Sequence, residues 1–246
     1  MLENIEDLKK FNIIKPDKIV YKKVQTNWDA VAKPLDGMGR FERIIDQIGA
    51  IQGSAQIDIS KKAVIIMCAD NGVVAEGVSQ SGQEVTLAVA HSMAKKQSSV
   101  GRMAEMIGVE TIPVDIGINS TEKIDGVLDR KVSWGTKNFA VEPAMTQEET
   151  LKAIETGIDI VRSCKEAGYG LLATGEMGIG NTTTSAAVAA ALLGCDAELV
   201  TGKGAGLDDK GLTTKIDVIK SALKKYELYD ADAFTVLRTV GGLDIA

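Results

Sequence analysis

The stretch LLATGEMGIGNTTTSAAVAA, residues 171–190, decides how this chain folds. It reads as a short buried strand, a turn with three glycines, and a helix that begins at Asn181 or Thr182. Glycine lets backbone N–H groups approach a ligand closely, and the first turn of a helix carries unpaired N–H donors at the positive end of its dipole. The turn therefore predicts a phosphate site at the end of a strand.

Glu176 is the unexpected residue of this stretch, because a carboxylate beside a bound phosphate is repelled by it. We expect such a carboxylate to face a hydroxyl group or a positive charge, such as a ribose or a developing cation. The combination indicates ribosyl-phosphate chemistry, with Glu176 as the candidate for the chemical step.

Two further stretches predict strands of the same sheet. AVIIMCAD, residues 63–70, is an apolar run that ends in a polar residue, which is typical of a central parallel strand covered on both faces. Residues 110–118, ETIPVDIGI, predict another strand. Strands and helical stretches alternate along the chain, so we expect an α/β fold: a Rossmann-like, mostly parallel sheet in three layers.

Helical periodicity marks the segments between these strands. One helix is expected to begin near Phe41 and one to cover residues 83–107, and Thr146 with Glu149 forms a capping box that starts a third. Because the first stretch of the chain is charged and helical in period, we expect it to form a small subdomain. The expected parts are 1–62, the N-terminal helical part of a small domain, and 63–246, the Rossmann-like α/β domain.

The composition excludes several classes of partner. The 246 residues are 45% hydrophobic, carry a formal charge of −6 and show no basic stripe, which argues against nucleic acid and anionic membranes and favours a small molecule. Cys68, Cys164 and Cys195 are odd in number and widely spaced, and His91 is the only histidine. We therefore expect reduced thiols, no disulfide framework, no metal site and a cytoplasmic protein.

The loop after residue 70, NGVVAEGVSQSGQEVT, is a candidate wall of the pocket, because the carboxyl ends of parallel strands face the ligand in open α/β sheets. Ser79, Ser81, Gln83 and Glu84 are its possible polar contacts. The alternative is a surface loop in which Ser81 is a helix N-cap and Glu84 completes a capping box.

A second glycine-rich loop lies in VTGKGAGLDDKGLTTKIDVIKSALKK, residues 200–225. Its glycines free the backbone around Lys203, and Lys215 is expected at the start of the helix that follows. Either lysine could pair with a phosphate. A solvated helix lysine is the alternative interpretation of Lys215.

Common motifs for other chemistries are missing from these loops. The turn reads G-x-x-G-x-G, which is neither the Walker form nor the dinucleotide-binding form, and the sequence contains no G-x-S-x-G elbow. The residues alone therefore indicate an α/β enzyme that binds a phosphorylated ligand.

The motifs GEMGIGNTTTSAA, KPLDGMGRFE, CADNGVVAEGVS, GKGAGLDDKGL with the following Lys-Ile, and VGGLDIA closely resemble those of the nicotinate-nucleotide:dimethylbenzimidazole phosphoribosyltransferase family over nearly the whole chain. The resemblance implies a Rossmann-like homodimer. It also implies transfer of phosphoribose from β-nicotinate mononucleotide to 5,6-dimethylbenzimidazole, which gives α-ribazole 5′-phosphate and nicotinate for the nucleotide loop of cobalamin, without a metal or other cofactor.

Site residues follow from the same resemblance. Glu176 would lie beside the ribose, and the base would rest near the loop that carries three polar residues: Ser79, Ser81 and Gln83. The phosphate would be held by Gly178, Gly180, Asn181, Thr182, Gly204, Ala205 and Lys215.

The sequence departs from the family pattern at two places. Where the family often has Asp-His-Gly, this chain has Asn71 in place of the histidine. The family's catalytic base is a glutamate in a later Gly-Glu-Gly-Thr-Gly-like segment, and this sequence ends at Ala246 before any such motif. We therefore expect a C-terminally incomplete chain in which Glu176 or another chain must accept the proton.

Two alternatives remain open. One is a catalytically inactive fragment or binding subunit that retains the ribosyl-phosphate site. The other is a sugar-phosphate or nucleotide enzyme of a different α/β family.

Overall fold

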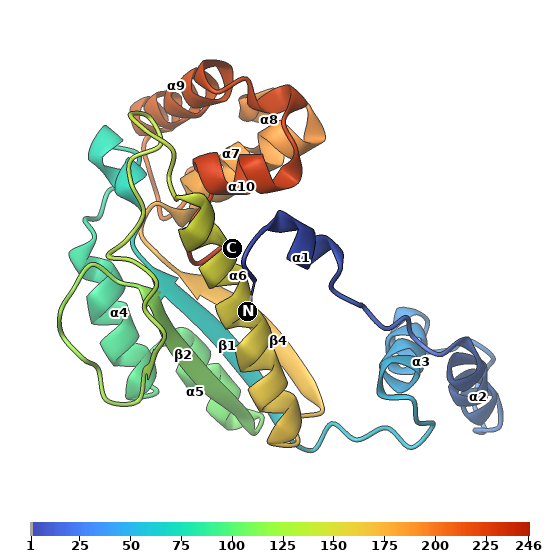
Figure 1. Cartoon of the computed structure of the whole chain (residues 1–246). Helices are drawn as coiled ribbons and strands as arrows, with labels where there is room; N and C mark the ends of the chain where they lie inside the picture. Colours follow the sequence, from blue (N-terminus) through green and yellow to red (C-terminus); the bar gives the residue numbers. More distant parts are fainter. Residues whose placement is uncertain (1) are drawn as a thin grey trace.

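A parallel sheet forms the centre of the computed structural model, which describes residues 2–246 (Figure 1). The strand order is β3-β2-β1-β4, and neighbouring strands pair in parallel. The strands are β1 (Lys62–Ala69), β2 (Val109–Gly117), β3 (Leu128–Asp129) and β4 (Leu171–Met177). The predicted α/β fold with a parallel sheet is confirmed.

Both faces of β1 are covered by helices, which makes the molecule three-layered at its centre. The covering helices are α4 (Glu84–Ala94), α5 (Ser99–Met106) and α6 (Gln147–Glu166). Successive side chains of a strand point to opposite faces, so Ile65 packs with Ile160 of α6, whereas Ile66 packs with Ala90 of α4. The continuous apolar run of β1 follows from this burial on two sides.

The single helix expected over residues 83–107 is wrong, because the chain forms α4 and α5 with a break between them. Lys96 adopts a left-handed backbone conformation with φ of 54°, which no helix continues through. Ser98 then caps α5, since its Oγ accepts a hydrogen bond of 3.2 Å from the N–H of Gly101. The apolar periodicity runs through both helices and hides this break.

The capping box predicted at the start of α6 is confirmed. Thr146 Oγ1 accepts from the N–H of Glu149 at 3.1 Å, and the Glu149 carboxylate accepts from the N–H of Thr146 at 2.8 Å. These reciprocal bonds satisfy two backbone donors and fix where α6 begins.

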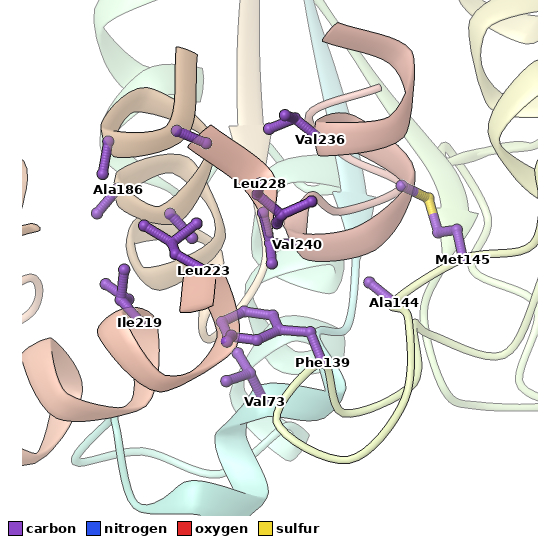
Figure 2. Packing of buried hydrophobic residues seen from close by; sticks show 14 of the residues in the cluster. Val73, Phe139, Ala144, Met145, Ala186, Ile219, Leu223, Leu228, Val236 and Val240 are labelled. Atoms are coloured by element: carbon purple, nitrogen blue, oxygen red, sulfur yellow. The ribbon is translucent and has the colours of Figure 1, made fainter. Parts of the chain in front are cut away.

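A layer of helices closes the carboxyl end of the sheet. Its members are η1 (Gly72–Glu76), α7 (Asn181–Leu193), α8 (Ala197–Val200), α9 (Asp209–Lys225), η2 (Leu228–Asp230) and α10 (Ala233–Val240). Their apolar side chains form the cluster of Figure 2, in which Phe139 from the loop before α6 lies between Val73 and Leu223. This cluster fixes α7 and α9 relative to the strand ends, where the glycine-rich turns lie.

The N-terminal part forms a helical hairpin that stands apart from the sheet (Figure 1). It consists of α2 (Lys18–Asp29) and α3 (Arg40–Gln52), whereas the short α1 (Ile5–Lys9) lies closer to α6. The helix predicted near Phe41 is confirmed as α3, but its expected apolar face is largely exposed, with Ile44 51% and Ile51 66% accessible. The division of the chain at residue 62 stays a prediction.

Within residues 2–246, none of the helices is both long and apolar enough to cross a membrane.

Candidate functional site

The turn between β4 and α7 is built around two glycines that no other residue could replace without distortion. A Cβ on Gly178 would lie 2.3 Å from the carbonyl oxygen of Ala69, and Gly180 has a φ of 94°. Both features bring the backbone of the turn close to the end of β1. Helix α7 begins at Asn181, as the sequence predicts.

The first turn of α7 presents backbone donors at this point. The N–H groups of Thr183 and Thr184 bond to the carbonyl oxygen of Gly180, at 2.9 and 3.3 Å. Within the described residues, the N–H of Thr182 makes no such bond. A free N–H at the positive end of a helix of 13 residues is suited to an anion.

Lys215 is fully buried beside this turn, at 0% exposure. Its Nζ donates to Thr182 Oγ1 at 2.7 Å and to the carbonyl oxygen of Gly202 at 3.1 Å, and among residues 2–246 no carboxylate forms an ion pair with it. Burial lowers the pKa of Lys215, because the charged form loses its hydration. The site therefore contains a buried ammonium that contacts only neutral oxygens.

The position of Lys215 differs from the sequence expectation. It lies in the second turn of α9 rather than at the start of the helix, and it is buried rather than solvated. The helix begins earlier because Asp208 caps it, with its carboxylate accepting from the N–H of Gly211 at 2.7 Å.

The two glycine-rich turns face each other across a cavity of about 60 Å³. A Cβ on Gly204, whose φ is 58°, would lie 2.9 Å from Thr182 Oγ1 and 3.5 Å from Lys215 Nζ. The predicted phosphate residues in the cavity wall are Gly178, Gly180, Asn181, Thr182, Gly204 and Ala205. The structure therefore brings these six residues together, with Lys215 directly behind Thr182.

Glu176 lies at the edge of the same site, near the end of β4. Its carboxylate accepts a hydrogen bond from Asn181 Nδ2, and its strand neighbour on β1 is Met67. Packing around the carboxyl group raises the pKa of Glu176 through loss of hydration, while the residue as a whole stays accessible. Because its pKa is raised, this carboxylate accepts a proton more readily than a fully hydrated glutamate does.

The residues expected near the base are only partly brought to this cavity. Ser79 lines it, and Gln80, which the sequence reasoning did not select, donates from its amide to the carbonyl oxygen of Gly206. Ser81 bonds through its N–H to Ser79 Oγ at 3.3 Å, and Gln83 donates from Nε2 to the carbonyl oxygen of Asn71 at 3.3 Å. Ser81 and Gln83 are not among the residues that line the cavity.

The alternative of an N-cap at Ser81 is wrong. Helix α4 begins at Glu84, and its N-cap is Gln83, whose helical backbone and lack of a side-chain bond leave no capping box. An N-cap side chain accepts a hydrogen bond from the first turn of its helix, and within the described residues Ser81 accepts none: its N–H bonds to Ser79 Oγ instead.

Sequence reasoning missed a buried polar cluster under the turn. Asp70, Asn71 and Asp244 are at most 7% exposed, and each has a side-chain oxygen that is buried without a partner among the described residues. The only available signal is the sequence VGGLDIA, in which an acidic residue stands among apolar residues and glycines.

Other features lie outside this site. His91 Nε2 lies 2.9 Å from Glu122 Oε1, and no group of three or more His, Cys, Asp or Glu side chains placed to hold a metal ion occurs within residues 2–246. A larger cavity of about 460 Å³ lies beside Lys131 and Trp134, and it shares no lining residue with the glycine-rich turns.

The fold and the site together define a class. A parallel α/β sheet with glycine-rich turns, a helix N-terminus and a buried lysine at its carboxyl end is typical of proteins that bind a phosphorylated small molecule.

Comparison with known proteins identifies the family. Residues 13–246 match a family model described as phosphoribosyltransferase. Nicotinate-nucleotide–dimethylbenzimidazole phosphoribosyltransferase of Clostridium tetani is 43% identical over 95% of this chain and 65% of its own length, and that of Ruminiclostridium cellulolyticum is 43% identical over 99% and 68%. The crystal structure of CobT from Thermus thermophilus superposes with a TM-score of 0.85 at 35% identity, covering 92% of this chain and 68% of that one.

The chain therefore belongs to the nicotinate-nucleotide–dimethylbenzimidazole phosphoribosyltransferase family. It spans about two thirds of the length of the relatives it matches.

Proposed function

We propose that this chain catalyses phosphoribosyl transfer from nicotinate mononucleotide to 5,6-dimethylbenzimidazole. The substrates are those in the names of its relatives, and the activity serves cobalamin nucleotide-loop assembly. The observation that carries the proposal is the buried ammonium of Lys215, which contacts only the neutral oxygens of Thr182 and Gly202. A buried cation without a counter-charge is costly, and the 5′-phosphate of the nucleotide would neutralise it.

The 5′-phosphate would lie between the two glycine-rich turns. Backbone N–H groups of the turn from Gly178 to Thr182 would donate to it, and Gly204 and Ala205 would close the opposite side. Lys215 would act through Thr182, with its charge close to the phosphate. The cavity of about 60 Å³ supports this placement, because it suits one small group and not a whole nucleotide. The sugar and base would extend outward past Glu176.

The reaction needs one bond to break and one to form at C1′ of the ribose. The N-glycosidic bond to nicotinate breaks with both electrons moving to the pyridine nitrogen, and an imidazole nitrogen of the base attacks C1′ from the opposite face. Inversion at C1′ gives the α-riboside phosphate and free nicotinate. The imidazole N–H proton passes to a carboxylate, and Glu176 is the candidate on this chain because its pKa is raised.

Positive charge grows at C1′ as nicotinate leaves. A carboxylate beside the ribose stabilises that charge in the transition state more than in the ground state, which is the condition for catalysis. Glu176 can serve in this way, in proton acceptance, or in both. The pyridinium-like bond is already activated, so binding and orientation supply much of the remaining acceleration.

The aromatic base would rest against the loop that carries Ser79, Ser81 and Gln83. This loop reaches over the cavity, and its Gln80 side chain bonds to the second glycine-rich turn at Gly206. Apolar support would come from Val78, which lines the same cavity. The proposal also includes a cytoplasmic homodimer, as the family resemblance implies, and its three free cysteines fit a reducing compartment.

The test is release of nicotinate from nicotinate mononucleotide by the purified chain, with and without 5,6-dimethylbenzimidazole. The proposal expects release that depends on the base and yields α-ribazole 5′-phosphate. Tight nucleotide binding without release would instead favour a binding subunit. Failure to bind the nucleotide while another sugar phosphate stabilises the fold would favour a different α/β enzyme. Light scattering and cell fractionation would test the dimer and the location.

A further inference from the structure

Asp244 is a buried acid for which the proposed reaction has no use. It lies in the loop after α10, is 7% exposed, and has both carboxyl oxygens buried without a hydrogen-bond partner among the described residues. No ion pair within residues 2–246 includes it. An ionised carboxylate in such a place would lose its hydration, and only the Asn71 amide and the backbone N–H groups of Asp244 and Ile245 would offset that loss.

The carboxyl group of Asp244 lies beside the carboxamide of Asn71. Asp244 Oδ1 and Asn71 Oδ1 are 2.3 and 2.5 Å from the point that a Cβ on Gly242 would occupy. Asp244 Oδ2 and Asn71 Nδ2 are 2.5 and 2.9 Å from the corresponding point on Gly178. The two side chains are therefore neighbours: by addition of these distances, the two Oδ1 atoms lie within 4.8 Å of each other, and Asp244 Oδ2 lies within 5.4 Å of Asn71 Nδ2.

Two hydrogen bonds between these side chains require a proton on Asp244, which an ionised carboxylate lacks. Asn71 Nδ2 can donate to Asp244 Oδ2, but the two Oδ1 atoms are both acceptors when Asp244 is ionised. Asn71 Oδ1 is itself buried without a partner in the described part of the chain. A hydroxyl on Asp244 would donate to Asn71 Oδ1 and satisfy both groups.

The surrounding charges favour the neutral acid as well. Asp244 lies close enough to the Glu176 carboxylate of β4 and to the buried Cys68 thiol of β1 for their charges to interact, and Asp70 precedes Asn71 at the end of β1. Burial, and after it the negative charge of Glu176, raise the pKa of Asp244 to about 7 from an ordinary value of 3.8, although the Asn71 amide and the backbone N–H groups of Asp244 and Ile245 act in the opposite direction.

We propose that Asp244 is a neutral carboxylic acid paired with Asn71 through two hydrogen bonds, and that this acid–amide pair holds the Gly178 turn in the conformation that receives the phosphate. Asp244 is thus a positioning residue and does not touch the ligand. The part that concerns the ligand rests on the proposed function, whereas the protonation of Asp244 does not.

The Asp244–Asn71 pair can act on the turn because it packs so closely against Gly178 that even a methyl group would not fit between them. The Gly178 backbone lies against Asp244 Oδ2, Asn71 Nδ2 and the Ala69 carbonyl oxygen, so a shift of the carboxyl group moves the turn. Ionisation of Asp244 would break the hydrogen bond to Asn71 Oδ1 and add a negative charge beneath the phosphate site. Both effects weaken binding of a phosphate as the pH rises.

The ligand test compares the affinity for nicotinate mononucleotide of the wild type and Asp244→Asn between pH 6.5 and 8.5. An asparagine keeps the shape and donates to Asn71 Oδ1 at every pH. The wild type is expected to lose about tenfold in affinity relative to the variant across this range, which corresponds to one pKa unit of coupling. Titration of the nucleotide's own phosphate cancels in the ratio. A constant ratio would overturn the positioning role.

A matched control uses a second buried acid. Asp46 of α3 is 2% exposed, its Oδ1 has no partner in the described chain, and burial together with Glu42 and Asp29 raises its pKa. It lies in the N-terminal hairpin, apart from the glycine-rich turns. Asp46→Asn is therefore expected to keep the wild-type pH profile of nucleotide affinity. A profile as flat as that of Asp244→Asn would contradict the specific role of Asp244.

A second measurement tests protonation without any ligand. Because the pKa of Asp244 is raised in the folded state, its contribution to the free energy of unfolding is complete below about pH 4 and is lost as the pH rises to about 7. The wild type is expected to lose stability relative to Asp244→Asn over this window, and its infrared spectrum to show a carboxylic acid band that the variant lacks. A stability difference that is constant with pH, without that band, would overturn the proposal even if the nucleotide never binds.

Discussion

Lys33 and Lys215 are both withdrawn from water, yet their surroundings differ. In the N-terminal hairpin, Lys33 Nζ lies 2.8 Å from Glu42 Oε1 and 5.7 Å from the centre of the Trp28 ring. Beside the glycine-rich turns, Lys215 Nζ contacts only Thr182 Oγ1 and the carbonyl oxygen of Gly202. The fold pairs the charge of Lys33 with a carboxylate, whereas Lys215 has no carboxylate partner within the described residues.

The difference separates structure from function. A paired buried charge is compensated in the free protein, and removal of one partner destabilises the fold. An unpaired buried ammonium lowers the free energy of unfolding of the free protein. Binding of an anion offsets this cost. We therefore assign Lys33 to the stability of the hairpin and Lys215 to a phosphate ligand.

The largest expected effect is a loss of turnover on substitution of Glu176, a carboxylate that lies at the site but does not pair with Lys215. Glu176 bonds to Asn181 rather than to the lysine, which leaves it for the role in the reaction that we propose. Glu176→Gln is expected to lower nicotinate release by about 100-fold or more, the range for loss of a general base, while nucleotide binding persists or tightens. The measurement is steady-state nicotinate formation beside calorimetric binding.

Glu198→Gln is the control for Glu176→Gln, because Glu198 pairs with Lys220 away from the turns. It is expected to release nicotinate at the wild-type rate. Unchanged turnover in Glu176→Gln would remove Glu176 from the mechanism and leave it as a residue that shapes the turn.

The next largest effect is expected from removing the charge of Lys215, which abolishes the difference between the two lysines. Lys215→Met keeps the length of the side chain and removes its charge, so the affinity for nicotinate mononucleotide is expected to fall by about 1.5–3 kcal/mol, the range for a hydrogen bond to a charged group. Binding of 5,6-dimethylbenzimidazole alone is expected to change little. The free energy of unfolding in urea is not expected to fall, because the variant no longer buries an unpaired cation.

Lys220→Met on the exposed side of α9 is the matched control and is expected to keep nucleotide affinity. Equal loss of nucleotide and base binding in Lys215→Met, together with a lower free energy of unfolding, would make Lys215 a structural residue like Lys33.

A smaller effect is expected at the second glycine-rich turn. Gly204→Ala places a Cβ 2.9 Å from Thr182 Oγ1 on a residue with a φ of 58°, which is expected to cost about 1 kcal/mol of nucleotide affinity. In Gly202→Ala no atom lies within 4 Å of the added Cβ, so affinity is expected to stay. The measurement is calorimetric binding of nicotinate mononucleotide to both variants. Equal affinities would show that the second glycine-rich turn does not contact the nucleotide.

No effect on nucleotide binding is expected from a change at Lys33, the lysine that is paired with Glu42. Lys33→Met leaves Glu42 without its cation and is expected to lower the melting temperature while nucleotide affinity is unchanged. Lys33 lowers the pKa of Glu42, so its contribution to stability is present above about pH 4.5 and is lost as the pH falls. The variant is therefore expected to lose less stability on acidification than the wild type. A fall in nucleotide affinity would mean that the hairpin takes part in the site.

The sequence predicted the elements whose signals are local. β1 is marked by its apolar run, α6 by its capping box and α7 by the glycines before it, and each lies where we expected it. β4 forms at the expected residues, but the expectation of a buried strand is wrong, because β4 is an edge strand of the sheet and none of its residues is buried. The glycine-rich turn at Gly178 was predictable because only glycine fits there, which is a local constraint.

Features that depend on distant contacts were not predictable in this way. The burial of Lys215 follows from the packing of α9 on α7, residues far apart in the sequence. The pair of Asp244 with Asn71 joins two loops that meet only in the folded chain. The break at Lys96 and the exposed face of α3 were missed because apolar periodicity records neither a single left-handed residue nor the absence of a covering element.

The central claim is that the two glycine-rich turns and Lys215 bind a phosphate, and one calorimetric comparison tests it most directly. Nicotinate mononucleotide and nicotinate riboside differ only in the 5′-phosphate. The account predicts that the nucleotide binds the wild-type chain at least about tenfold more tightly than the riboside, since a hydrogen bond to a charged group contributes about 1.5–3 kcal/mol. Equal affinities for the two ligands would contradict it.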